Sequence, residues 1–205
     1  MAVYTVAITG ASGAIYGLTL LEQLAAADHE ISLVVSRDGA TVVREETGVD
    51  WSGAPAAVQR KLDRRYAGRV RWWDHADFYA PIASGSHLTD GMVIAPCSMK
   101  TAAAVAHGLA SGLIERAADV TLKERRPLIV VPRETPFSVI HLENLLALAR
   151  AGAHVVPAMP AFYHQPKSID DLVAFVVGRI LDHLGVPHTL VPRWGEDTRR
   201  RPHER

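Results

Sequence analysis

The chain has 205 residues, of which 48% are hydrophobic and 21% are charged, so it is long and apolar enough to bury a core and is not a disordered chain. Lys and Arg together number 22, as do Asp and Glu, and this balance argues against nucleic acid as a partner. The single cysteine, Cys97, cannot form an intrachain disulfide and has no zinc-ligand spacing around it. We therefore expect no metal site and a cytoplasmic location.

The amino-terminal segment is uncharged up to Glu22, which is also a property of signal peptides and membrane spans. No Lys or Arg precedes its apolar part, and Gly10, Ser12, Gly13 and Gly17 interrupt it. A strand, a glycine turn and a helix account for these residues better than a span does. No other stretch approaches the length of a membrane helix, so we expect no membrane association.

Apolar, β-branched runs alternate with helical patterns along the chain. The predicted strands are residues 3–9, 31–35, 91–95, 127–131 and 153–156. The predicted helices are residues 14–27, a segment ending near 46, 98–107, 113–123, 135–151 and 168–184. In the fifth of these helices Thr135 is the expected N-cap and Pro136 the first-turn proline, and residues 168–171 resemble a capping box.

The alternation predicts an α/β fold in which one domain forms a doubly wound, Rossmann-like or flavodoxin-like parallel sheet flanked by helices. We place this domain at residues 1–187 and a partly flexible, arginine-rich tail at 188–205, where Trp194 is the residue most suited to dock. Residues 48–86 look less regular than the rest.

Polar residues follow several of the predicted strands. The turn Gly10–Gly13 leads into a helix whose N–H groups would be free to hold a phosphate, with the Ser12 hydroxyl beside them. A second helix start carries Ser98, Lys100 and Thr101, and Ser36 ends another strand. Because ligands of open α/β sheets bind at the carboxyl ends of the strands, these groups favour one shared site there.

Charged residues suggest the rest of that site. Arg133 provides a planar fork suited to phosphate, with the Glu134 carboxylate next to it. Arg116 and Lys123 are seven residues apart and share a helix face. By themselves such charges are also typical of a solvated surface.

Taken together, the segments GASGAIYG, APCSMKT, AADVTLKERRPL, RETP and PAFYHQP resemble the UbiX-type flavin prenyltransferases, in order and at the spacing of that family over residues 3–184. The resemblance implies a flavin-binding domain that transfers the five-carbon group of dimethylallyl monophosphate to N5 and C6 of reduced FMN. It also implies that the product, prenylated FMN, serves a UbiD-type decarboxylase in quinone synthesis or aromatic-acid breakdown.

The resemblance also assigns residues. The FMN contacts that it implies are Gly10, Ala11, Ser12, Gly13, Ser36, Ser98, Met99, Lys100, Thr101 and Arg133. The allyl phosphate is expected to meet Tyr163, Arg179, Arg116 and Lys123, of which Lys123 is also counted as catalytic beside the carboxylates Glu134 and Glu46. Members of the family assemble as dodecamers with sites at subunit junctions, so one chain is expected to hold an incomplete site.

Three other functions share some of these features. A short-chain dehydrogenase is disfavoured because Ala14 and Tyr16 stand where its glycine pattern needs glycine, and Pro166 disrupts its Tyr163–Lys167 helix. An FMN-dependent cysteine decarboxylase has a histidine where Pro81 precedes Ile82, and a different motif in place of APCSMKT. A non-catalytic FMN-binding subunit of a decarboxylase stays open, as does the choice between monophosphate and diphosphate as the leaving group.

Overall fold

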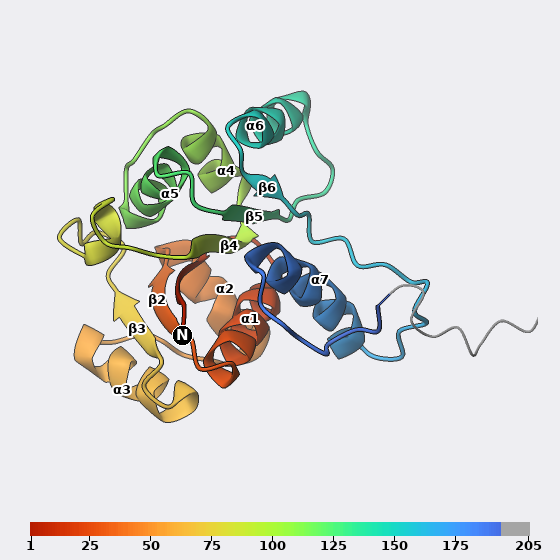
Figure 1. The fold of residues 1–205 in the computed structure, drawn as a ribbon, viewed down its shortest axis with the longest axis horizontal. Helices are drawn as coiled ribbons and strands as arrows, with labels where there is room; N and C mark the ends of the chain where they lie inside the picture. Colours follow the sequence, from red (N-terminus) through yellow and green to blue (C-terminus); the bar gives the residue numbers. More distant parts are fainter. Residues whose placement is uncertain (194–205) are drawn as a thin grey trace, which may run out of the picture.

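Six parallel strands form the centre of the molecule, seen in a computed structural model that describes residues 1–193 (Figure 1). The strands are β1 (Val3–Ile8), β2 (Glu30–Val35), β3 (Val70–Trp73), β4 (Gly91–Cys97), β5 (Leu128–Pro132) and β6 (His154–Val155). The sheet order is β3-β2-β1-β4-β5-β6, and every neighbouring pair is parallel. The doubly wound α/β fold expected from the sequence is therefore confirmed, with one strand more than predicted.

Helices cover both faces of this sheet. They are α1 (Ala14–Ala26), α2 (Arg37–Thr47), α3 (Pro55–Tyr66), the short 3₁₀ helix η1 (Pro81–Ala83), α4 (Met99–Ala106), α5 (Leu113–Lys123), α6 (Val139–Arg150) and α7 (Ile169–Leu184). In Figure 1, α1, α2, α3 and α7 lie below the sheet, whereas α4, α5 and α6 lie above it. No helix within residues 1–193 combines the length and the apolar character that a membrane span requires.

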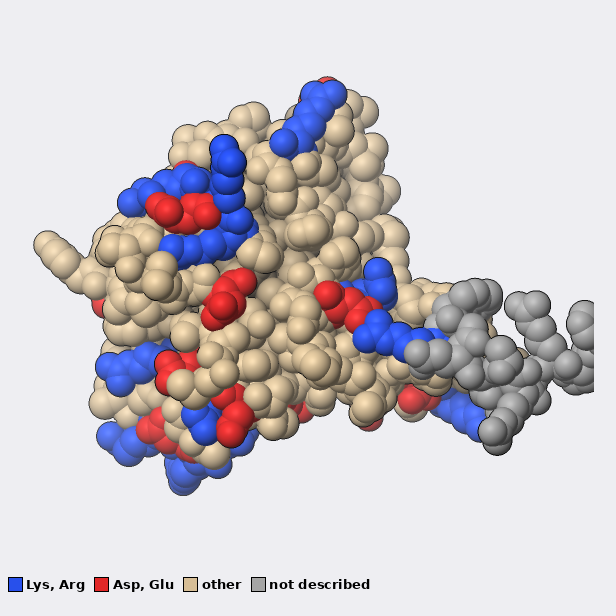
Figure 2. Space-filling model, in the orientation of Figure 1, with Lys and Arg blue, Asp and Glu red and all other residues tan. Residues whose placement is uncertain are grey.

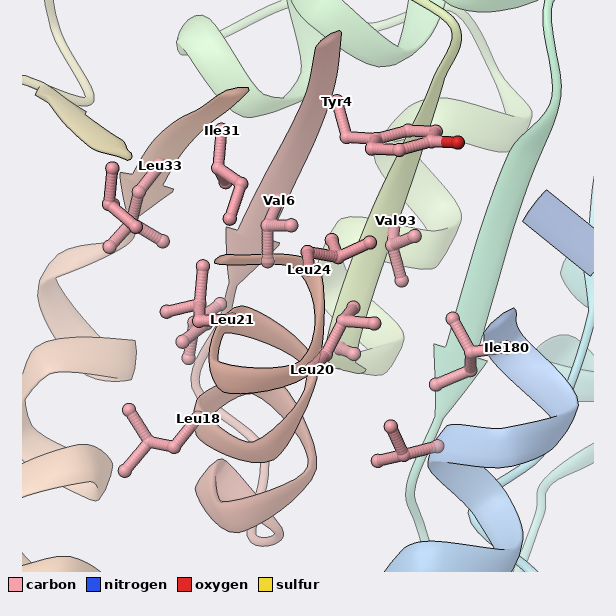
Figure 3. Packing of buried hydrophobic residues seen from close by; sticks show 14 of the residues in the cluster. Tyr4, Val6, Leu18, Leu20, Leu21, Leu24, Ile31, Leu33, Val93 and Ile180 are labelled. Atoms are coloured by element: carbon pink, nitrogen blue, oxygen red, sulfur yellow. The ribbon is translucent and has the colours of Figure 1, made fainter. Parts of the chain in front are cut away.

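The core is divided by the sheet into two apolar clusters. Alternate residues of one strand point to opposite faces, so Ile94 lies in one cluster and its neighbour Val93 in the other. Both faces of the central strands are buried, which explains why their sequences are mainly apolar rather than alternating. Figure 3 shows Leu21 and Leu24 of α1 packed against Val6, in the cluster that also holds Ile180 of α7.

Residues 48–86 are more regular than the sequence indicated. They contain α3 and the edge strand β3, which pairs with β2. In α3 only Val58, Leu62 and Tyr66 are buried, a narrow apolar stripe on an otherwise charged helix. The four-residue strand β3 buries Val70 and exposes Arg71. Short length and one solvated face made both elements inconspicuous in the sequence.

Helix α6 begins later than predicted. Thr135 and Pro136 are neither its N-cap nor its first turn, because Ser138 caps the helix that starts at Val139. The Ser138 hydroxyl accepts a hydrogen bond from the N–H of His141, and Nδ1 of His141 accepts one from the N–H of Ser138, both at 3.2 Å. This reciprocal capping satisfies two N–H groups, which a start at Pro136 would not achieve. The capping box predicted for α7 is confirmed at Ser168 and Asp171.

Candidate active site at the carboxyl edge of the sheet

The residues that follow β1, β2, β4 and β5 meet at the carboxyl edge of the sheet, as the sequence suggested. The N–H of Ser36 donates to the carbonyl of Ile8 at 3.0 Å. The N–H of Ser98 donates to the hydroxyl of Thr9 at 2.7 Å, and the N–H of Arg133 donates to the carbonyl of Cys97 at 3.3 Å. These bonds join the ends of four strands. The site therefore contains the glycine turn, Ser36, the start of α4 and Arg133 within one polar region.

The glycine turn after β1 packs too closely against its neighbours for larger residues. A Cβ at Gly10 would lie 2.5 Å from the Cβ of Asp38, in the first turn of α2. Gly13 has a φ of 108°, a left-handed conformation that favours glycine. One turn into α1, a Cβ at Gly17 would overlap the carbonyl oxygen of Ala95. Glycine at these positions lets α1 pack directly on the end of β4.

Glu46 occupies the N-terminus of α1 and thereby corrects one expectation. Its carboxylate accepts hydrogen bonds from the N–H groups of Gly13 and Ala14, each at 2.9 Å. These are the groups that the sequence left free for a phosphate, so the anion at the start of α1 is a side chain of the protein itself. Burial alone would raise the pKa of Glu46, but hydrogen bonds from Ser12, Gly13 and Ala14 and the charge of Arg133 hold it below its ordinary value.

The start of α4 is the other helix N-terminus at this edge that the sequence identified. The Ser98 hydroxyl caps it by accepting a hydrogen bond from the N–H of Thr101 at 3.3 Å, and it lies 3.1 Å from the Thr101 hydroxyl. The first-turn N–H groups of Met99 and Lys100 point along the helix axis toward the same edge. Ser36 caps α2 in the same way, with its hydroxyl 3.0 Å from the N–H of Gly39. Hydroxyls and amides therefore surround the place where an anion would bind.

Tyr16 also belongs to this region; the motif GASGAIYG contains it, but no role at the site was expected of it from the sequence. Its ring lies against the glycine turn, since a Cβ at Gly13 would be 2.9 Å from a ring carbon. Burial raises the pKa of the Tyr16 phenol, and the nearby charge of Arg133 partly opposes that effect. A tyrosine in the first turn of the helix that follows the glycine turn is the signal that could have found it. The guanidinium of Arg133 thus acts on both Tyr16 and Glu46.

Glu134 follows Arg133 and is half-buried at the same edge. Its Oε1 accepts a hydrogen bond from the N–H of Thr135 at 3.0 Å. With Thr135 as the predicted N-cap, a helix would begin immediately after Glu134 and fix its position. Instead the connection 133–138 separates it from α6, and the Thr135 amide is the contact that orients its carboxylate. Among residues 1–193, no group donates a hydrogen bond to its other oxygen.

Tyr163 and Arg179 lie on the same side of α7. Tyr163 precedes the helix and packs edge-on against Phe175, with 5.9 Å between ring centroids. Phe175 and Arg179 are four residues apart, so they are neighbours on one helix face. Arg179 is half-exposed and donates to the Asp182 carboxylate at 2.9 Å. The structure therefore places both expected phosphate ligands along the face of α7 that carries Phe175.

Arg116 and Lys123 lie elsewhere in the chain. They belong to α5, which packs on the opposite face of the sheet from α7. Lys123 ends α5 just before β5 begins, near the amino edge, where its ammonium pairs with Glu124 at 2.6 Å. Arg116 donates to the carbonyl of Ala83 at 3.0 Å. Blue and red atoms gather over α5 in Figure 2. One chain does not unite these cations with Tyr163 and Arg179.

Two further expectations concern Cys97 and metals. Cys97 is fully buried at the end of β4, and burial followed by the charge of Glu115 raises the pKa of its thiol. Within residues 1–193, no three His, Cys, Asp or Glu side chains are grouped so that they could hold a metal ion. Trp194 and the tail beyond it lie outside the described residues.

Comparison with known proteins identifies the family. The model of the family described as Flavoprotein matches residues 3–181. The chain is 52% identical to the flavin prenyltransferase UbiX of Pseudomonas aeruginosa, over 94% of this chain and 93% of that protein. It is 46% identical to the flavin prenyltransferase UbiX of Methanocaldococcus jannaschii, over 93% of this chain and 97% of that protein.

Solved structures agree with this assignment. A dodecameric FMN-dependent UbiX-like decarboxylase from Escherichia coli O157:H7 is 46% identical, with a TM-score of 0.83 over 94% of this chain and 98% of that one. AnUbiX (PadA1), solved in complex with FMN and dimethylallyl pyrophosphate, is 41% identical, with a TM-score of 0.85 over 94% and 97%. The FMN-dependent cysteine decarboxylase SpaF is 14% identical and shares the fold alone. The chain thus belongs to the UbiX family of flavin prenyltransferases and is an enzyme of that prenyl-transferring class.

Proposed function

We propose that this enzyme transfers the dimethylallyl group of dimethylallyl monophosphate to N5 and C6 of reduced FMN, in the cytoplasm, without a metal ion. One observation carries the proposal: the glycine turn, the start of α4 and Arg133 meet at one edge in a chain 41% identical to a protein solved with FMN and dimethylallyl pyrophosphate. The hydroxyls, first-turn amides and guanidinium found there are the groups that a flavin phosphate requires.

The flavin phosphate is best held at the start of α4. The α1 amides already serve the carboxylate of Glu46, whereas the amides of Met99 and Lys100 and the hydroxyls of Ser98 and Thr101 face the same edge. Arg133 adds the positive charge, and Ser36 a further hydroxyl. Gly10, Ala11, Ser12 and Gly13 would then line the wall against which the flavin ring lies.

Reduced FMN supplies the two positions, N5 and C6, that bond to the five-carbon group. Each of these positions gives up one proton, and one carbon of the former double bond of the prenyl donor gains a proton. The reaction therefore releases phosphate and one net proton. The chain's own residues must stabilise the leaving phosphate. Tyr163 and Arg179 provide a hydroxyl and a guanidinium on one face of α7, which together can take up the negative charge that develops on the phosphate.

Glu134 is the better suited of the two carboxylates to accept a proton. Glu46 accepts two backbone N–H groups, and these bonds hold its pKa low, which makes it a weak base. Glu134 uses Oε1 for one backbone amide, and within residues 1–193 its other oxygen accepts no hydrogen bond. We therefore assign proton transfer to Glu134 and assign to Glu46 the task of holding the glycine turn and the start of α1 against α2.

The complete site needs more than one copy of the chain. Lys123 and Arg116 can join Tyr163 and Arg179 at one allyl phosphate only if they come from a neighbouring subunit, because α5 and α7 cover opposite faces of one sheet. Exposed apolar residues on α6, Val139, Ile140 and Leu142, provide a surface for such an assembly. We propose a homo-oligomer, as in the dodecameric relative, and a UbiD-type decarboxylase as recipient of the product.

The test is anaerobic incubation with reduced FMN and either dimethylallyl monophosphate or dimethylallyl pyrophosphate, followed by mass spectrometry of the flavin. The proposal expects a mass gain of one five-carbon unit with the monophosphate. Glu134→Gln should lower the rate about 10²–10⁴-fold, as loss of a positioned base does, while FMN still binds. A flavin that binds but gains no mass with either compound would show a non-catalytic FMN-binding subunit instead.

The shared site has its own test. Lys123→Ala and Arg179→Ala should each be nearly inactive, and assemblies formed from a mixture of the two chains should regain activity, because some junctions then contain both native residues. Mixed assemblies that stay inactive, although native mass spectrometry shows both chains in them, would place the two residues in one subunit's site and contradict the proposal.

A further inference from the structure

Asp182 is the centre of a cluster of cations at the carboxyl-terminal end of α7. Its Oδ2 accepts a hydrogen bond from Arg179 at 2.9 Å. Its Oδ1 accepts one from Arg193 at 2.6 Å and lies 3.2 Å from Nε2 of His188. Figure 2 shows blue and red side chains in contact over α7. One carboxylate therefore fixes three side chains, two of which are always positively charged.

This arrangement differs from an ordinary surface ion pair. The side chain of Asp182 is 17% exposed, whereas those of Arg179 and Arg193 are 50% and 49% exposed. The carboxylate is thus enclosed, and the outer faces of both guanidiniums remain open to an incoming anion. Burial would raise the pKa of Asp182, but hydrogen bonds from Arg193 and His188 keep it below its ordinary value, so the carboxylate is ionised at neutral pH. Two guanidiniums against one carboxylate leave a net positive charge.

The same carboxylate anchors the segment that follows α7. His188 is almost fully enclosed, with a side-chain exposure of 2%. Its ring packs against α7 at Gly178, where an added Cβ would lie 3.0 Å from the Cε1 of His188. Val186 is buried in the apolar cluster beneath. Figure 1 shows residues 186–193 running back along α7. Asp182 therefore connects this segment, through His188 and Arg193, to the helix face that carries Arg179.

We propose that Asp182 is a positioning residue that orients the guanidinium of Arg179 toward the phosphate of the prenyl donor and couples that orientation to the docking of residues 186–193. Arg179 uses Nη1 for the carboxylate, so its remaining N–H groups are held in one direction rather than sampling many. A fixed guanidinium binds phosphate at a smaller entropic cost than a free one. The inference rests on the proposed function, because it assigns Arg179 to the leaving phosphate.

The test compares Asp182→Asn with a matched control, Asp28→Asn. Asp28, which follows α1, pairs with Arg69 at 2.6 Å outside the Asp182 cluster, so the control also removes one carboxylate from an arginine. Asparagine at 182 keeps the size and one acceptor but loses the charge. We expect the KM for dimethylallyl monophosphate to rise about 10-fold in Asp182→Asn, with the dissociation constant of FMN unchanged and no such rise in the control. Asp182→Glu, which keeps the charge, should recover part of the loss.

A second measurement separates the two halves of the proposal. Hydrogen exchange of residues 186–193 should quicken in Asp182→Asn, because His188 and Arg193 lose their charged partner. Faster exchange with an unchanged KM would show an anchor alone and would overturn the positioning role. An equal loss of FMN affinity would indicate that α7 itself is disturbed, and it would overturn that role as well.

Failure of the proposed function is distinguishable from failure of this inference. If the wild-type protein does not prenylate FMN with either compound, binding of inorganic phosphate is measured by isothermal titration calorimetry. Wild-type protein should then bind phosphate about 10-fold more tightly than Asp182→Asn, and Arg179→Ala should bind as weakly as that variant. Equal phosphate affinity in all three proteins would overturn the inference.

Discussion

Replacement of Glu46 by glutamine tests the contact that joins α2 to the start of α1. In the wild-type protein the carboxylate accepts the N–H groups of Gly13 and Ala14, and it sits at the positive end of the α1 dipole. Both of these N–H groups bond to Oε2, so the amide oxygen of glutamine, which has nearly the same shape, can still accept them in that place. The substitution therefore removes the negative charge that strengthens both bonds and the second acceptor oxygen, Oε1, which lies 3.2 Å from the N–H of Gly13, while it leaves the packing intact.

The expected loss in the free energy of unfolding follows from these two terms. A carboxylate at a helix N-terminus contributes about 0.3–1 kcal/mol, and a hydrogen bond to a charged group about 1.5–3 kcal/mol before solvent screening. Because Glu46 is exposed, screening reduces the second figure, and we expect a total of about 1 kcal/mol. For a chain of this length that corresponds to a melting temperature lower by about 2–4 °C.

The effect should depend on pH in a defined direction. The pKa of Glu46 in the folded protein lies below its ordinary value of 4.5. When the pKa of a carboxyl is lower in the folded than in the unfolded protein, its stabilisation of the fold is fully present above the pKa of the unfolded state. That stabilisation is lost as the pH falls through the pKa of the folded state. The difference between wild type and Glu46→Gln should thus be constant from pH 7 to about pH 5.5 and shrink below about pH 4.5.

Urea unfolding at fixed protein concentration, at pH 7 and at pH 4, measures both quantities. Glu45→Gln is the control, because Glu45 is an exposed neighbour on the same helix turn. The reasoning is refuted if the two variants lose the same stability, or if the loss in Glu46→Gln is as large at pH 4 as at pH 7.

Three further outcomes are expected. Gly17→Ala should destabilise the fold by about 1–3 kcal/mol in urea unfolding, since its Cβ would overlap the carbonyl oxygen of Ala95. Gly91→Ala, with 3.1 Å from its Cβ to the nearest atom, should cost less. Cys97 should resist a thiol reagent in the native protein and react after unfolding, because it is fully buried; rapid native labelling would contradict its placement. Arg133→Ala should weaken FMN binding about 10- to 150-fold by loss of a charge-assisted contact, as read by flavin fluorescence, and an unchanged dissociation constant would remove Arg133 from the flavin site.

The central sheet and the position of the site could be predicted from sequence because they depend on local patterns. Strands β1, β2, β4 and β5 are buried on both faces and therefore appear as mainly apolar runs, in which Thr5 and Ser32 are the buried polar side chains. The glycine turn and the start of α4 follow two of them, and parallel topology places such residues at one edge. The edge elements α3 and β3 were not predicted because one face of each is solvated. The start of α6 was predicted wrongly because Thr135 and Ser138 are both acceptable N-cap residues.

Contacts between residues far apart in the chain required the tertiary structure. The carboxylate of Glu46 binds the N–H groups at the start of α1, where a phosphate was expected. Glu46 and Gly13 are 33 residues apart in sequence, and no local pattern indicates the hydrogen bond between them. The packing of α5 and α7 on opposite faces separates Lys123 from Arg179, although both carry charges suited to phosphate. Sequence determines which chemical groups the chain possesses and where each strand ends. Which of those groups share a site depends on the face of the sheet against which each connecting helix packs. Only the tertiary structure decides that face.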